Sequence, residues 1–165
     1  MLFVLRMIML TLHFVLVGFA SLFMLFRPFN PDNSRIMGRL YSLPAIRLLG
    51  LRVKRDTDSL LQHPRSYVVV ANHQSNYDLF VLGCTVPVRT VSLGKKSLKW
   101  VPLFGWIYWL SGNVLIDRGN AIKAKQAMLT TTDTLQHKHT CIWVIAEGTR
   151  NLGKGTKPPK KGAFQ

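Results

Sequence analysis

Acidic residues and cysteines are scarce in this sequence of 165 residues. Seven Asp and Glu stand against 22 Lys and Arg, and the formal net charge at pH 7 is +15. The two cysteines lack C-x-x-C spacing, which favours free buried thiols over a disulfide or a metal site. The length allows one domain with a real core and excludes a disulfide-built miniprotein. Disorder is disfavoured because 48% of the residues are hydrophobic.

High positive charge together with high apolar content is typical of two classes of protein. A strongly basic chain often binds nucleic acid. A basic and apolar chain equally fits a protein that lies against an anionic membrane. The sequence has no internal repeat and no long linker, so the distribution of apolar residues along the chain has to separate these two classes.

The apolar residues are concentrated near the N-terminus, where residues 7–26 contain no Asp, Glu, Lys or Arg. A helix of this length would be about 30 Å long, which matches the hydrocarbon thickness of a bilayer. We predict an uncleaved membrane anchor. The alternatives are a core helix and a cleavable signal peptide, for which residues 18–20 have the small-x-small shape of a cleavage site. The cations that follow place the later chain on the cytoplasmic side: Arg27, Arg35, Arg39 and Arg47.

Residues 36–53 carry apolar side chains at steps of three or four, which predicts a helix. Arg39 and Arg47 fall within the apolar arc, so the two faces are not cleanly separated. This segment could rest at the membrane interface with its arginines reaching outward, or pack on the core with Pro44 as a kink or break. We therefore divide the chain into a membrane anchor with an interfacial helical segment, 1–53, and a second domain, 54–165.

The second domain alternates short β-branched runs with helical ones, which predicts an α/β fold with a largely parallel or mixed sheet. Asn120 is the expected N-cap of the clearest helix. Functional residues in such folds follow the carboxyl ends of the strands. The expected strands are 67–71, 89–93, 114–116 and 140–146, and the expected helices are 79–84 and 120–138.

A first polar cluster, residues 72–78, follows the first expected strand. His73 and Asp78 are five residues apart, a spacing that neither a helix nor a strand would bring together, whereas a turn could. There the carboxylate would fix the imidazole tautomer and leave the other ring nitrogen free to accept a proton from a substrate hydroxyl. On spacing alone, a capping Asp beside a turn His is the alternative.

Two further clusters follow other expected strands. Residues 147–150 read Glu-Gly-Thr-Arg and contain the only Glu in the chain, and residues 112–118 end in Asp117 and Arg118. Thr and Arg can bind a phosphate, although an exposed turn with an ion pair has the same composition. Three clusters at strand ends favour a functional site over three unrelated turns.

These motifs, in this order, resemble the glycerophospholipid acyltransferase family. The resemblance rests on Asn-His-x4-Asp at 72–78, Gly-Asn-Val-Leu-Ile-Asp-Arg at 112–118 and Glu-Gly-Thr-Arg at 147–150. It extends through almost the whole chain, including the segments 94–98, 100–105 and 161–164. His-x4-Asp alone is a weak signal, whereas the ordered set is specific.

The resemblance implies the chemistry and the partners. His73 would act as general base on the free hydroxyl of 1-acylglycerol 3-phosphate, with Asp78 orienting it. The acyl donor would be acyl-CoA or acyl carrier protein, and the product phosphatidic acid. No metal and no cofactor beyond the donor is implied, and the partners would be membrane lipids at the cytoplasmic face of a bacterial inner membrane, with no nucleic acid. The glycerol phosphate would be held by Arg118, Glu147, Gly148, Thr149 and Arg150.

Other interpretations of the function remain, both within and outside this family. The acceptor could be another glycerophosphate or lysophospholipid, or the chain could be a basic membrane-binding protein without catalysis. The sequence departs from the family in having Ala146 where Pro is common. It also stops at Gln165, where the family continues with a Pro-containing strand and further helices. We therefore expect an acyltransferase domain whose C-terminal part is missing.

Overall fold

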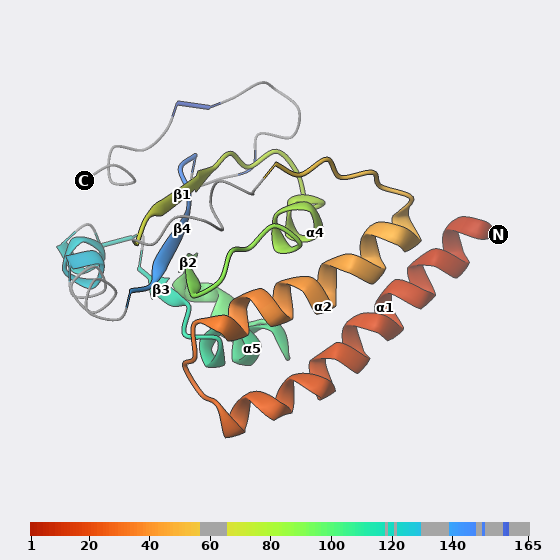
Figure 1. Cartoon of the computed structure of the whole chain (residues 1–165), viewed down its shortest axis with the longest axis horizontal. Helices are drawn as coiled ribbons and strands as arrows, with labels where there is room; N and C mark the ends of the chain where they lie inside the picture. The colour runs from red at the N-terminus through yellow and green to blue at the C-terminus, as the bar shows by residue number, and fades with distance from the viewer. Residues whose placement is uncertain are drawn as a thin grey trace.

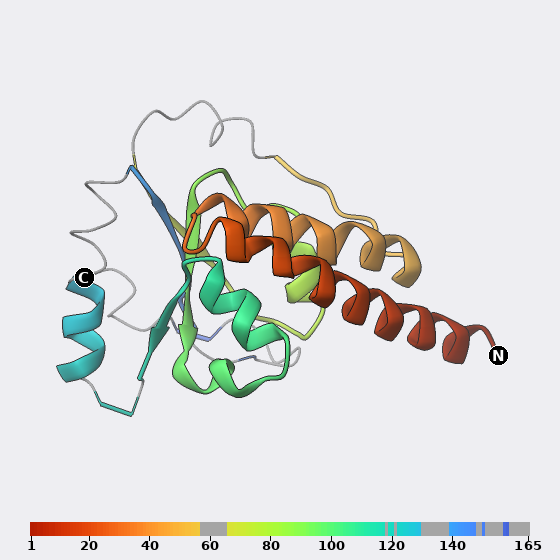
Figure 2. The same cartoon turned by 90° about the horizontal axis from the view of Figure 1, so that it is seen from below.

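The structure, a computed structural model, describes residues 1–56, 66–117, 119–120, 122–129, 139–147, 150 and 157–158. Helices α1, α2, α4 and α5 lie on one side of a sheet, and the helical residues 122–129 lie on the other (Figures 1 and 2). The elements in chain order are α1 (Leu2–Ala20), η1 (Ser21–Phe26), α2 (Asp32–Leu49), β1 (Val68–Ala71), α4 (Asp78–Gly83), β2 (Thr90–Lys95), η2 (Lys96–Trp100), α5 (Phe104–Leu110), β3 (Val114–Ile116) and β4 (Cys141–Ile145).

The sheet has four strands in the order β1-β4-β2-β3, and all three neighbouring pairs are parallel. Each strand begins and ends within two residues of its predicted bounds. The predicted α/β class and largely parallel sheet are confirmed. Since parallel strands share one carboxyl edge, the register Ala71↔Ile145 brings the residues after β1 and β4 side by side.

Helix α1 packs on the core along one side and exposes apolar side chains on the other. Residues Leu2–Phe26 are long and apolar enough to cross a membrane, by length and composition. Val17 and Gly18 are the buried residues of this helix. Val17 packs in a cluster with Met24, Met37 and Tyr41. Most of the remaining side chains of α1 are exposed, Phe3, Leu12 and Phe19 among them. The apolar run therefore packs on the domain along one side and leaves the other side uncovered.

Helix α2 is packed between α1 and α4 (Figure 1). It continues through Pro44 to Leu49 and ends at Gly50 in the left-handed conformation (φ 69°), so Pro44 does not break it. Its buried apolar stripe is Met37, Tyr41 and Ala45, spaced four residues apart. Two apolar side chains that follow the helical spacing predicted for residues 36–53, Leu40 and Leu43, are exposed instead, because the neighbouring helices cover a different face.

Two glycines allow α2 and α4 to cross at close range. A Cβ added at Gly38 would lie 2.6 Å from the carbonyl oxygen of Gly83, and a Cβ added at Gly83 would overlap Oγ of Ser42. Ser42 also donates a hydrogen bond across the contact to the carbonyl oxygen of Leu79, 3.4 Å away. The crossing fixes α4, and with it the turn that precedes α4.

The predicted helix 120–138 is described in part. Residues 122–129 are helical, and Oδ1 of Asn120 accepts a hydrogen bond from the amide of Lys123 at 3.0 Å, which confirms Asn120 as the N-cap. Residues 130–138 lie outside the described part. Cys84 and Cys141 are buried and free, as predicted.

Candidate active site

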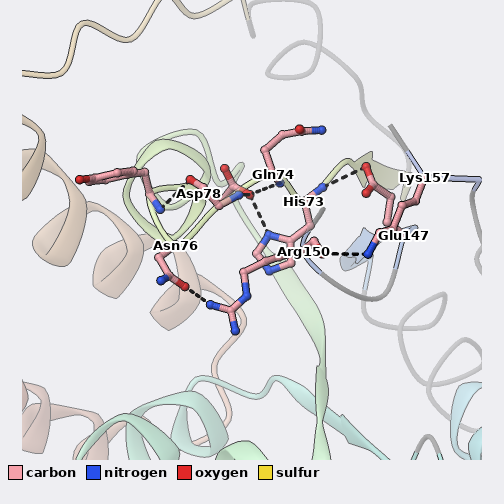
Figure 3. Close-up of polar contacts among 9 residues, drawn as sticks. His73, Gln74, Asn76, Asp78, Glu147, Arg150 and Lys157 are labelled. Atoms are coloured by element: carbon pink, nitrogen blue, oxygen red, sulfur yellow. Dashed lines mark hydrogen bonds and ion pairs between the residues drawn. The ribbon is translucent and has the colours of Figure 1, made fainter. Parts of the chain in front are cut away.

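The site forms where β1 and β4 end. β1 is a run of valines that ends at Ala71, and β4 ends at Ile145, its partner in the parallel register. The amide of Ala146 donates to the carbonyl oxygen of Ala71 at 3.1 Å, so the pairing continues one residue beyond β4. His73 and Glu147, each two residues beyond the paired strand ends, therefore emerge next to each other (Figure 3).

Asp78 holds His73 in the turn between β1 and α4. Nδ1 of His73 lies 2.7 Å from Oδ2 of Asp78. The same carboxylate oxygen accepts hydrogen bonds from the amides of Gln74 at 2.7 Å and Ser75 at 3.0 Å. A carboxylate only accepts hydrogen bonds, which assigns the imidazole proton to Nδ1 and leaves Nε2 as the basic nitrogen. The turn thus brings together the two residues that the sequence analysis paired.

The ionised form of Asp78 is favoured in this turn. Partial burial by itself would raise the pKa of the carboxyl group. The hydrogen bonds from the amide of Ser75, the His73 side chain and the amide of Gln74 outweigh burial and hold the pKa of Asp78 below its ordinary value. Asp78 is therefore a permanent anion at neutral pH, able to orient the imidazole and to stabilise its protonated form.

Glu147 is buried, with 5% of its surface exposed. Its Oε1 accepts a hydrogen bond from the backbone amide of His73 at 3.3 Å (Figure 3). The chain's only Glu thus connects the segment after β4 to the segment that carries the imidazole. The family resemblance implies that Glu147 helps to hold the phosphate, whereas this contact also suits Glu147 to position His73.

Arg150 brings a positive charge to the same turn. Its side chain passes beside His73 and donates a hydrogen bond through Nη1 to Oδ1 of Asn76 (Figure 3). Nζ of Lys157 donates to the carbonyl oxygen of Arg150 at 2.9 Å. Arg150 is exposed, which leaves its guanidinium open to an anionic ligand beside the imidazole.

The third polar cluster lies at the same edge of the sheet but farther along it. β3 is separated from β4 by β2, and Asp117 follows β3 directly. Oδ2 of Asp117 pairs with Nζ of Lys96 at 3.5 Å, with both side chains about half exposed. Arg118, Gly148 and Thr149, which were also predicted to hold the phosphate, lie outside the described residues.

Part of the site was not identified from the sequence. The backbone amides of Gln74 and Ser75 belong to the polar run 72–78, yet backbone donors carry no residue signature. The side-chain oxygen of Asn76, in the same run, accepts a hydrogen bond from Arg150, which lies 74 positions away in the sequence. The contact between His73 and Glu147 joins residues 74 positions apart and depends on strand register. Within the described part of the chain, no group of three or more His, Cys, Asp or Glu could hold a metal ion.

The sequence profile of the Acyltransferase family matches residues 52–165. The chain belongs to the acyltransferase family. A 1-acyl-sn-glycerol-3-phosphate acyltransferase of Salmonella typhimurium is 38% identical over 165 residues, which cover 99% of this chain and 67% of that protein. The enzyme of the same name from Escherichia coli K12 has the same identity and coverage. Mouse 1-acyl-sn-glycerol-3-phosphate acyltransferase alpha is 37% identical over 135 residues, 82% of this chain and 47% of that protein.

The fold has a counterpart among solved structures. The crystal structure of the 1-acyl-sn-glycerophosphate acyltransferase PlsC from Thermotoga maritima superposes with a TM-score of 0.67 at 22% identity. The match covers 99% of this chain and 69% of that one. The comparisons confirm the family resemblance that the three motifs indicate. They also confirm the predicted fold class of this acyltransferase.

Proposed function

We propose that this acyltransferase moves an acyl group from acyl-CoA or acyl carrier protein to the sn-2 hydroxyl of 1-acylglycerol 3-phosphate, giving phosphatidic acid. The observation that carries the proposal is the hydrogen bond of 2.7 Å between His73 and Asp78, formed beside Arg150. A base next to a cation fits an acceptor that bears both a hydroxyl and a phosphate. The names of the relatives support the same acceptor.

The reaction proceeds through the free imidazole nitrogen. Nε2 of His73 takes the proton of the acceptor hydroxyl, and the hydroxyl oxygen forms a bond to the thioester carbonyl carbon. The tetrahedral intermediate collapses as the carbon–sulfur bond breaks, and the imidazolium returns the proton to the leaving thiolate. Asp78 stabilises the imidazolium between these steps. The acyl thioester is a second substrate, and the scheme requires no other group.

Arg150 holds the acceptor's phosphate in this scheme. A guanidinium binds phosphate through charge-assisted hydrogen bonds of fixed direction, which would place the neighbouring hydroxyl against Nε2 of His73. Arg118, Gly148 and Thr149 complete the proposed phosphate site. Glu147 positions His73 and does not bind the phosphate. Its buried carboxylate already accepts a hydrogen bond from the amide of His73, and an anion beside the phosphate would repel it.

The acyltransferase associates with the membrane through the exposed apolar side of α1, which suits a substrate that is itself a lipid. We place the active site on the cytoplasmic side, because arginines follow the apolar run within a short distance. Arg27 and Arg35 are the first two of these. A reporter fused after Gln165 should therefore be cytoplasmic, and a periplasmic reporter would contradict this orientation.

The test of the activity is transfer of labelled acyl groups to 1-acylglycerol 3-phosphate in membranes that contain the protein. We expect His73→Ala to lower the rate by roughly 10²–10⁴-fold, the usual contribution of a positioned base. His139→Asn is the matched control. His139 precedes β4 at the opposite end of the strand from Glu147, and Asn tolerates its positive φ of 50°.

Two results would count against the proposal. Equal rates in the wild type and His73→Ala would remove His73 from the mechanism. Transfer to glycerol 3-phosphate or to another lysophospholipid, with none to 1-acylglycerol 3-phosphate, would keep the acyltransferase chemistry and change the acceptor.

A further inference from the structure

We propose that η2 and α5 form a second lipid-contacting surface, the tryptophan patch, defined by Trp100, Trp106 and Trp109. The patch lies at the boundary between headgroups and acyl chains and works together with α1. This inference rests on the membrane association proposed above. It concerns a different part of the molecule and predicts a contact that α1 alone would not produce.

The three indole rings point out of the protein. Trp100 is 76% exposed, Trp106 68% and Trp109 53%. On α5 the outward pair is spaced by three residues, while Gly105 and Ile107 face the interior. The fourth tryptophan, Trp143 in β4, is 8% exposed, as expected of a core residue. Neighbouring exposed apolar side chains widen the patch: Phe29, Val101 and Leu103.

The patch is continuous with the apolar surface of α1. Leu103, in the turn before α5, lies against Gly18, where an added Cβ would be 3.1 Å from Cδ1 of Leu103. Ile107 of α5 packs in the same cluster as Val17 and Met24. The rings of Phe29 and Trp109 meet edge to face at a centroid distance of 4.8 Å. Figure 2 shows α5 beside the C-terminal half of α1.

The turn that joins η2 to α5 is held in an uncommon conformation. Leu103 has φ 60° and ψ −52°, and the amide of Phe104 donates to the carbonyl oxygen of Pro102 at 2.6 Å, which is a γ-turn. A leucine in this conformation costs roughly 1–3 kcal/mol. The turn seats Leu103 against α1 and leaves the tryptophans of η2 and α5 on the outer surface.

The chemistry of the patch suits lipid more than water or nucleic acid. Indole rings prefer the membrane interface, where the ring meets acyl chains and the N–H meets headgroups. Nζ of Lys99 lies 4.5 Å from the ring centroid of Trp100, so a cation borders the patch. Lys95, the residue before η2, is exposed as well. These lysines complement anionic headgroups. Because the apolar surface continues onto α1, a bilayer can cover both at once, whereas a nucleic acid would meet hydrocarbon side chains.

The test measures the fluorescence of the tryptophans of the patch. The background variant W100F/W106F/W109F keeps Trp143 and leaves the core unchanged. Three further variants each restore one surface tryptophan to that background. Each full chain is reconstituted in vesicles of phosphatidylethanolamine and phosphatidylglycerol, with or without bromine on the acyl chains. Circular dichroism checks the fold, and co-sedimentation with vesicles reports binding through α1 separately.

We expect brominated acyl chains to quench the fluorescence of each restored tryptophan at least about twofold more than that of Trp143 in the background variant. Acrylamide added to the water should quench the fluorescence of the restored tryptophan only weakly. Strong acrylamide quenching without bromine quenching in vesicle-bound protein would overturn the proposal, since the patch would face water. Protection from both quenchers would overturn it as well, because the patch would then be covered by protein. The readout needs no substrate, so loss of acyl transfer leaves its outcome unaffected.

Discussion

The backbone amide of His73 donates a hydrogen bond to Oε1 of Glu147, 3.3 Å away, and joins the segment after β1 to the segment after β4. Both residues lie two positions beyond Ala71 and Ile145, which are partners in the parallel register. The place of the imidazole therefore depends on two neighbouring strands and on one buried carboxylate. Asp78 then sets the ring's orientation from the other side, through Nδ1.

Glu147→Ala should lower kcat for acyl transfer by about 10²-fold, because a displacement of about 1 Å of a catalytic group can cost that much. The KM for 1-acylglycerol 3-phosphate should change little if Glu147 positions His73 and does not bind the phosphate. Glu147→Gln keeps an oxygen acceptor for the amide and should recover much of kcat. A raised KM with unchanged kcat would instead support the phosphate-binding role that the family resemblance implies.

Asp78→Asn should change how stability depends on pH. The pKa of Asp78 is lowered in the folded protein, so its ionised form stabilises the fold at neutral pH. This contribution is present above the unfolded pKa of about 4 and is lost as the pH falls through the lower folded pKa. The difference in unfolding free energy between wild type and Asp78→Asn should therefore shrink on acidification, as measured by denaturant unfolding in detergent at a series of pH values.

Asp117→Asn is the matched control for that experiment. It removes one negative charge as well, but from a half-exposed pair with Lys96, so its effect on stability should be small at every pH. A difference between wild type and Asp78→Asn that is independent of pH would contradict the stabilising role assigned to the ionised carboxylate.

The sheet was predictable because its strands are short β-branched runs, such as the valines of β1, bounded by polar turns. The site was predictable in part, since Asp78 and His73 needed only a turn to meet. η2 and α5 were not predicted. Lys96–Trp100 and Phe104–Leu110 are short, and the γ-turn at Leu103 between them depends on packing against α1. The buried face of α2 was also set by its neighbouring helices, which its own periodicity does not reveal.

Gly38→Ala should destabilise the protein by about 1–3 kcal/mol, because the added methyl group would overlap the carbonyl oxygen of Gly83 and push α2 from α4. Acyl transfer should fall too, since α4 begins at Asp78. Gly50→Asn is the control: Gly50 has open space around its Cα, and Asn tolerates its φ of 69°. Thermal unfolding followed by circular dichroism measures both variants. Equal midpoints for Gly38→Ala and wild type would show that the helix crossing can relax.

Arg150→Ala should lower kcat/KM for 1-acylglycerol 3-phosphate by roughly 10–100-fold. This loss corresponds to the free energy of a charge-assisted hydrogen bond to the phosphate, about 1.5–3 kcal/mol. The KM for the acyl donor should stay near the wild-type value. Arg150→Lys keeps the charge but loses the planar guanidinium, so it should recover part of the loss.

Asn76→Ala separates binding of the phosphate from placement of Arg150. Oδ1 of Asn76 accepts a hydrogen bond from the Arg150 guanidinium, so this variant keeps the cation and removes its anchor. We expect a smaller loss than in Arg150→Ala, and little further loss when both substitutions are combined, because both act through the same guanidinium. Additive losses in the double variant would mean that Asn76 contacts the substrate independently. An Arg150→Ala enzyme with unchanged kcat/KM would remove Arg150 from the phosphate site and leave that role to residues 118, 148 and 149.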